Sequence, residues 1–348
     1  MRSPYVMNWN VGVQRQFGRD YLLEFTYQGS AGVGLLNRWD INAIPLNISS
    51  DPVQLENIRR AAQNFRPYPH FGNVLHYSNY GHSSFHSGMV KLEKRMSSGL
   101  SFTSFYTWGK SIDEASDDGT ASGVTYYNRR LEKARSNYDV AHRWITYAIW
   151  DLPFGNGKRF MTNGGSLVTK ILGNWQLAAI QTAETGIPIT FLHNGRLPGR
   201  TNVYLPGALR PDMALGKTYK DIQLDWDRHG PCRHTVACAE RWADLNAFAI
   251  PASFTPGQAG RNILNGPGMF WHQFGLSKHI PIGERVKGML RVEFTAPFKY
   301  PFFTRPSGAG ATVDFANPQF FGKITAQEGG FSGLGARTMT TAIFKLEF

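Results

Sequence analysis

The sequence predicts an all-β fold of long antiparallel strands, and three observations lead to this prediction. First, about nine segments alternate between apolar residues and polar or charged ones, which is the period of a strand with two different faces. Second, the last of these segments runs to the final residue and ends on an aromatic side chain. Third, short and long connections alternate along the chain. These patterns favour one large β-unit for the 348 residues.

Period-2 alternation places the strands in order along the chain. The expected spans are 6–16, 21–29, 84–96, 100–111, 142–152, 174–186, 269–280, 286–297 and 336–348. The second, third and eighth spans set apolar residues against charged ones such as Glu24, Lys91, Glu93, Arg291 and Glu293. We expect the opposite, apolar face to meet lipid rather than a protein core, and it comprises Leu23, Phe25, Tyr27, Val90, Leu92, Leu290, Val292 and Phe294.

The connections decide between a membrane barrel and a soluble sandwich. The short ones are residues 18–20, 97–99 and 281–284, with a medium link that opens at 153–157. Between them lie long connections at 30–83, 112–141, 187–268 and 298–335. Structureless loops of this length count against a soluble domain, whereas membrane barrels have short periplasmic turns and long extracellular loops. The sequence therefore predicts an antiparallel transmembrane β-barrel segment, about nine strands of a larger barrel, in the outer membrane of a Gram-negative cell.

Composition supports membrane strands and argues against nucleic acid as a partner. No apolar run approaches the ~18–20 residues of a membrane helix, but barrel strands need apolar residues only at alternate positions. The net charge is +12, yet no basic run exceeds a pair of residues, so the clustering of a nucleic-acid surface is missing. We expect outer-membrane lipid as a partner, together with anionic lipopolysaccharide or an anionic solute. Tryptophans on the predicted strands suit an interfacial girdle or a core equally well; they are Trp9, Trp108, Trp144, Trp150, Trp175 and Trp271.

The final strand has the pattern of an assembly signal. Phe344, Leu346 and Phe348 share one face and no polar tail follows them. Bacterial outer-membrane barrels end in this way, so we expect these residues to be recognised by the barrel-assembly machinery.

Deletion of Phe348 should therefore reduce assembly more than final stability. We expect less of the folded, heat-modifiable form of the complete protein in the outer membrane, measured by gel shift. Normal levels of that form in the deletion variant would contradict the assignment.

Several motifs in order resemble the C-terminal half of Oar-like TonB-dependent receptors. The matching stretches are SFHSGMVKLEKR at 84–95, GLSF at 99–102, YTWGKSID at 106–113, YDVAHR at 138–143, LPFG at 152–155, GNWQL at 173–177, TGIP at 185–188, GRNILNGPG at 260–268 and RVEF at 291–294. The resemblance spans almost the whole chain. It departs after Glu293, where Pro297 removes a ladder donor, so this strand is expected to end early or bulge.

The resemblance implies a 22-stranded barrel, filled by an N-terminal plug, whose uptake is driven by the TonB complex. This chain (1–348) is then the partial barrel domain, without plug or signal peptide, that forms wall and surface loops for an unidentified transported ligand. The TonB complex would act only through the missing N-terminal part. Counting back from the C-terminus, the strand near Trp9 is the ninth and starts on the extracellular side, whereas single-chain bacterial barrels have an even number of strands. We therefore expect an open, curved sheet with that strand as an unpaired edge. The alternatives are a secreted all-β carbohydrate-binding or hydrolytic domain and a small autonomous porin or adhesin.

Two cysteines lie close together in one predicted extracellular loop. His229, Cys232, His234 and Cys238 include the residue types that bind zinc, and free thiols are a further alternative. Because the cell surface is oxidising, we expect a Cys232–Cys238 disulfide. Mass spectrometry of non-reduced peptides should find the bonded pair, and two alkylatable thiols in exported protein would refute it.

Other polar clusters predict neither a cofactor nor an active site. The histidines at 70, 76, 82 and 86 match no metal-ligand spacing and are expected to be solvated loop residues. Asp113, Glu114, Asp117 and Asp118 precede Gly119, but they lack the ligand order of an EF-hand, so a solvated acidic loop is expected. No Gly-x-Ser-x-Gly, Gly-x4-Gly-Lys-Ser/Thr or His-Glu-x2-His motif occurs. The sequence thus predicts a non-catalytic protein without cofactor or metal.

Overall fold

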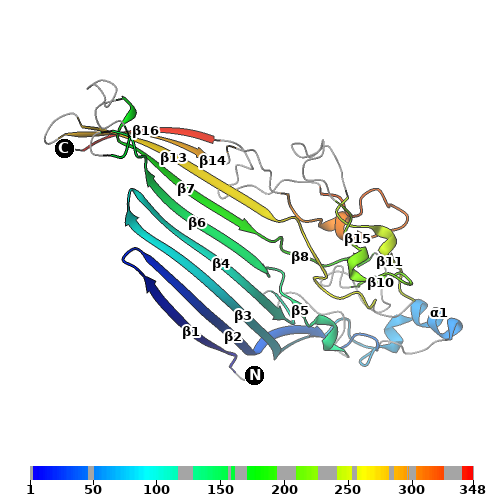
Figure 1. Cartoon of the computed structure of the whole chain (residues 1–348). Helices are drawn as coiled ribbons and strands as arrows, with labels where there is room; N and C mark the ends of the chain where they lie inside the picture. Colours follow the sequence, from blue (N-terminus) through cyan, green and yellow to red (C-terminus); the bar gives the residue numbers. More distant parts are fainter. Residues whose placement is uncertain are drawn as a thin grey trace.

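One antiparallel sheet runs through the whole chain in a computed structural model (Figure 1). The structure describes residues 3–45, 51–116, 128–155, 158–160, 171–193, 209–225, 241–252, 257–281, 286–295, 297, 303–324 and 339–347. Within these ranges, no helix is both long and apolar enough to cross a membrane.

The strands of the sheet lie beside one another in the order of the chain. They are β1 (Tyr5–Phe17), β2 (Tyr21–Asp40), β3 (Leu75–Ser97), β4 (Leu100–Asp113), β6 (His142–Asp151), β7 (Trp175–Glu184), β13 (Met269–Pro281), β14 (Lys287–Thr295) and β16 (Met339–Glu347). A short piece, β5 (Ala134–Arg135), pairs with the end of β4. Each segment predicted as a strand forms one, and the all-β antiparallel fold class is confirmed.

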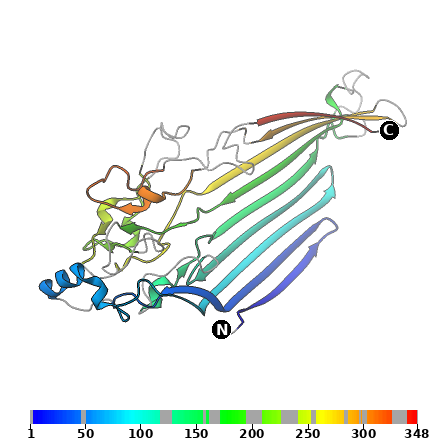
Figure 2. The ribbon, with the colours of Figure 1, turned by 180° about the vertical axis from the view of Figure 1, so that it is seen from behind.

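The sheet is open and curved, and it has two edges (Figures 1 and 2). Among the described residues, β1 pairs only with β2, and β16 pairs only with β14. Every residue of β1 is exposed. The expected unpaired edge near Trp9, with no ladder to the last strand, is therefore present.

The register places the predicted apolar residues on one continuous face. Partners directly opposite in an antiparallel pair point to the same side of the sheet. Phe25 lies opposite Val90, which lies opposite Tyr106 on β4. At the other end of the sheet, Leu276 on β13 lies opposite Val292. Tracing these pairs across the strands puts all the residues predicted to meet lipid on this face, which we call the outer face.

The tryptophans divide unequally between the two faces. By the same register, Trp271 lies on the opposite side, which we call the inner face, and the outer face holds Trp9, Trp108, Trp144, Trp150 and Trp175. Trp108, with 64% of its surface accessible, is packed into no core. This distribution favours the interfacial girdle over core tryptophan.

Two strands extend far beyond their predicted ends. The predicted connection 30–83 is in fact shorter, because β2 continues to Asp40 and β3 begins at Leu75. The extension lacks apolar alternation and therefore escapes a search for period 2. It is held by backbone pairing instead, with register shifts between Val33 and Leu35 and between Leu35 and Asn37. Such bulges bend a strand and increase its twist. The expected early end before Pro297 is confirmed, since β14 stops at Thr295.

An arginine on the outer face should cost far more than one on the inner face. At mid-strand, Val292→Arg should destabilise the complete protein by ~2–4 kcal/mol, because a guanidinium would lose water at the bilayer midplane. Thr341→Arg is the matched control, since Thr341 lies opposite Glu293 on the inner face. Denaturant titration in lipid vesicles measures both. Equal losses for the two variants would show that Val292 does not meet lipid.

Candidate functional site

The inner face carries ion pairs that run across the strands. Lys91 Nζ lies 3.0 Å from Glu93 Oε2 and 4.0 Å from Glu24 Oε2. Further along the sheet, Arg143 Nε on β6 donates to Glu184 Oε2 on β7 at 2.7 Å. Each cation lies beside an acidic side chain, so this face presents paired charges rather than a field of one sign. The arrangement suits a wetted or polar lumen.

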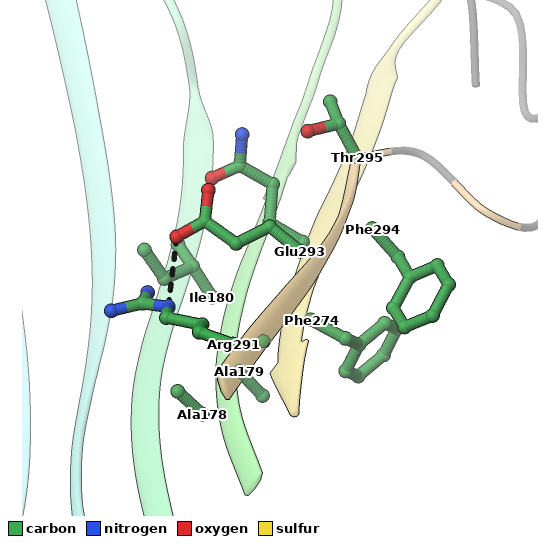
Figure 3. A pocket seen from close by; sticks show the side chains of 10 residues that line it. Ala178, Ala179, Ile180, Phe274, Arg291, Glu293, Phe294 and Thr295 are labelled. Atoms are coloured by element: carbon green, nitrogen blue, oxygen red, sulfur yellow. Dashed lines mark ion pairs between the residues drawn. The ribbon is translucent and has the colours of Figure 1, made fainter. Parts of the chain in front are cut away.

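A small hollow on the inner face is centred on Arg291 and Glu293 of β14 (Figure 3). The Nε of Arg291 lies 2.8 Å from Oε1 of Glu293. Arg291 reaches over β13, since a Cβ on Gly275 would lie 3.4 Å from its Nε and Nη2. A larger residue at Gly275 would push the guanidinium away from the sheet. The remaining lining is mainly small or apolar and comprises Ala178, Ala179, Ile180, Gln273, Phe274, Phe294 and Thr295.

The described parts of the long connections form a packed layer at the end of the sheet opposite the short turns (Figures 1 and 2). We call this the loop layer, and it consists of the described parts of residues 128–141, 187–268 and 303–324. Its centre is a cluster of buried apolar residues that includes Phe191, Phe248 and Phe321. The three rings pack with centroids 4.9–5.7 Å apart. The long connections predicted from the sequence therefore contain packed structure in these segments.

Short strand pairs tie the loop layer together. They are β12 (Leu264–Asn265) with β8 (Pro188–Ile189), β10 (Asp212–Met213) with β11 (Phe248–Ala249), and β15 (Thr312–Val313) with β9 (Leu192–His193). The last pair is parallel and joins two different long connections. Burial lowers the pKa of His193, and nearby Asp212 opposes this shift.

Buried arginines connect the loop layer to the strand ends. Arg210 donates to Glu132 Oε2 at 2.6 Å, and both side chains are almost fully buried. Burial lowers the pKa of the Arg210 guanidinium, which Glu132 partly offsets. Arg261 pairs with the carboxylate of Asp113 at the end of β4 and donates to its carbonyl at 2.9 Å. It also donates to the carbonyl of Glu132 at 3.1 Å. Asp113 is thus a structural partner, not a solvated loop residue.

A second junction links Arg135 to Asn262. Arg135 Nη2 donates to the carbonyl of Asn262 at 2.9 Å, and its Nη1 donates to Asn265 Oδ1 at 2.6 Å. Asn262 has a φ of 58°, a left-handed conformation that asparagine tolerates. Its Nδ2 donates back to Asn137 Oδ1 at 2.8 Å. Burial lowers the pKa of Arg135, whereas Asp139 acts in the opposite direction.

The first long connection has a polar junction of its own, beyond α1 (Pro52–Arg60). Asn42 Nδ2 donates to the carbonyls of Tyr68 and Phe71 at 3.0 Å each and to that of Gly72 at 2.7 Å. Arg66 donates to the carbonyl of Asn42 at 3.1 Å. A single buried amide therefore fixes the backbone of a whole turn.

The predicted site residues have separate outcomes. The cysteine loop (229–238) and Asp117, Asp118 and Gly119 lie outside the described residues, as does Phe348. Phe344 and Leu346 are exposed and share the outer face, and their role as an assembly signal stays a prediction. The histidines form no cluster, and the prediction that all are loop residues is wrong, because His76, His82 and His86 lie on β3. Among the described residues, no group of three or more potential ligands could hold a metal ion.

Sequence reasoning missed the arginine junctions. Arg261 and Asn262 lie in a motif used only for the resemblance, and their partners are more than 100 residues away in the chain. No local period marks such pairs. The GRNILNGPG stretch could have indicated a junction, because an arginine and two asparagines lie among glycines in a connection otherwise assigned to loop.

A one-layer antiparallel sheet with an apolar outer face, an ionic inner face and long connections gathered at one end defines the wall of a membrane β-barrel. The family model described as "Outer membrane beta barrel domain" matches residues 1–339, and the chain belongs to this family. Its location is the cell outer membrane.

Solved structures and curated proteins provide two further comparisons. The outer membrane transporter YddB from Escherichia coli matches with a TM-score of 0.42 and 6% identity. The match covers 99% of this chain and 32% of that one, so the chain spans about a third of that transporter. Among curated proteins, none matches this sequence.

Loss of one partner from the Arg210–Glu132 pair should open the loop layer. Arg210→Met removes the guanidinium that contacts the buried carboxylate of Glu132, which should cost about 3–5 kcal/mol. The paired variant Arg210→Met/Glu132→Leu should recover most of this loss, because no lone charge remains buried. Protease treatment of whole cells, followed by peptide mapping of residues 209–264, measures the opening. A double variant as sensitive as the single one would contradict the buried-pair explanation.

Proposed function

We propose that the chain forms wall and surface loops of a non-catalytic, TonB-dependent transporter of the Oar-like kind. The observation that carries the proposal is the pairing of two features on one sheet: ionic side chains on the inner face and a packed loop layer at one end. Wall strands with a polar lumen side and loops that are already folded suit a receptor whose outer mouth recognises a solute.

The open edges support a segment of a larger barrel. A row of unpaired backbone groups along β1 inside a bilayer would be strongly unfavourable, so further strands would have to complete the ladder. On this proposal the chain alone transports nothing, and the TonB complex acts through elements outside these residues. The proposed partners are outer-membrane lipid, lipopolysaccharide and the barrel-assembly machinery.

The alternatives fit less well. A secreted carbohydrate-binding or hydrolytic domain would bury the outer face between two sheets, yet Phe25 and Trp108 on that face are exposed. An autonomous porin or adhesin needs a ladder between β1 and β16, which the described residues lack.

Uptake measurements test the proposal against these alternatives. Cells that carry the complete protein are assayed for uptake of labelled ferric siderophores and short oligosaccharides, with and without functional TonB. We expect uptake of at least one probe class that requires both the protein and TonB. Uptake that persists without TonB would indicate a porin, and release of cleaved oligosaccharide would indicate a hydrolase. Either result would reject the proposal.

A further inference from the structure

Two tyrosine–histidine pairs recur on the outer face with the same geometry. The hydroxyl of Tyr27 lies 2.7 Å from Nδ1 of His86, and the hydroxyl of Tyr106 lies 2.8 Å from Nδ1 of His142. In each pair the rings stack, with centroids 6.2 and 6.1 Å apart. Each histidine sits on the neighbouring strand, on the loop-layer side of the residue opposite its tyrosine.

Each pair keeps a polar hydrogen for a third group. If the tyrosine hydroxyl donates to Nδ1, the histidine carries its proton on Nε2, which remains a donor. If Nδ1–H donates to the tyrosine oxygen, the tyrosine O–H remains a donor. If the histidine is protonated, both its Nε2–H and the tyrosine O–H remain donors. In every protonation state the pair therefore offers at least one donor, and a donor without an acceptor at a membrane surface is unfavourable.

Lys110 and two tryptophans, Trp9 and Trp108, lie near the Tyr–His pairs on the outer face. Lys110 lies opposite His86 in the register, and Trp108 lies opposite Gly88 on the same face. Trp9 lies across Gly29, where any Cβ would overlap the indole, and its ring centroid is 6.0 Å from that of His86. Lys110 forms no ion pair with any described residue. We call the group of Trp9, Tyr27, His86, Tyr106, Trp108, Lys110 and His142 the outer-rim patch.

The level of this patch is that of the membrane surface near the loop layer. His142 lies about eight residues along β6 from Trp150 at the turn end, roughly 27 Å at about 3.4 Å per residue. Tilted barrel strands cross an apolar band about 25 Å tall with about 9–11 residues. The pairs therefore lie where the hydrocarbon gives way to headgroups.

Two lysines on the same face, at the end of the sheet that carries the short turns, have a different environment. Lys94 Nζ donates to the carbonyls of Ser97 and Leu100 at 2.8 Å each, and it lies 5.8 Å from the ring centroid of Tyr21. Lys278 Nζ likewise donates to the carbonyl of Ile171 at 3.0 Å. Both side chains are buried. Near the short turns, backbone carbonyls thus accept the hydrogen bonds of the lysines. Near the loop layer, a lysine and several hydrogen-bond donors remain exposed.

From this contrast we infer that the outer-rim patch binds the phosphate of a glycolipid headgroup in the outer leaflet. Lys110 supplies charge, the Tyr–His pairs donate hydrogen bonds to phosphate oxygens, and Trp9 and Trp108 pack beside the sugar and upper acyl chains. The inference rests on the outward orientation of this face and not on transport.

Native mass spectrometry of the complete protein tests the inference. Delipidated protein in mild detergent is titrated with diphosphorylated lipid A and with the same lipid after phosphatase treatment. We expect wild type to prefer the phosphorylated form by about tenfold or more, because charge-assisted hydrogen bonds are lost with the phosphate. Lys110→Gln and the double variant Tyr27→Phe/Tyr106→Phe should each reduce the binding of the phosphorylated lipid by about tenfold.

Tyr147→Phe is the matched control, because Tyr147 is an exposed tyrosine of β6 on the inner face. It should leave the preference unchanged. Equal binding of the two lipids by wild type, or a full preference in Lys110→Gln, would overturn the inference. The lipid comparison needs no variant, so it decides the matter even if the double variant fails to fold. TonB-dependent uptake is recorded in parallel, and its loss with an intact lipid preference would reject the transport proposal alone.

Discussion

The backbone ladder of the sheet is the constraint on which the rest of this structure depends. Inside a bilayer every backbone N–H and C=O must find a partner in a neighbouring strand. The ladder fixes the register, and the register fixes which face each side chain occupies. One residue of slip on β14 would move Val292 inward and Glu293 into lipid. The inner ion pairs and the outer aromatic residues are therefore two consequences of one register.

Buried cationic side chains find different partners at the two ends of the sheet. At the turn end, Lys94 and Lys278 bind backbone carbonyls and need no outside partner. At the other end, long connections bury Arg210 and most of Arg261 and Arg135 against carbonyls and carboxylates. Such buried ions are retained only where each finds its partners, because desolvation otherwise dominates. The loop layer consequently behaves as folded structure rather than as mobile loop.

Strand identity, strand order and the assignment of faces could be predicted from the sequence, because a period of two is a local signal. Leu23, Phe25 and Tyr27 reveal their shared face without knowledge of any partner. The extension of β2 to Asp40 could not be predicted, since residues 30–40 lack apolar alternation and are held by backbone pairing with β3 and, as far as Val33, with β1. The site was harder still: Arg261 is matched to Asp113 by tertiary proximity, and no spacing in the sequence encodes that match. Conversely, the sequence places the histidines at 76 and 82 in a loop, whereas β3 extends through both positions.

The distance along the chain between contacts in the loop layer sets an order of assembly. Arg135 and Asn262 are separated by 127 residues, and Arg261 and Asp113 by 148. Closing such loops in an unfolded chain is entropically unfavourable and slow. Pairing of β7 with β13, where Glu184 lies opposite Met269, brings the ends of the longest connection together. We therefore expect the arginine junctions to form only after the strands beneath them have paired.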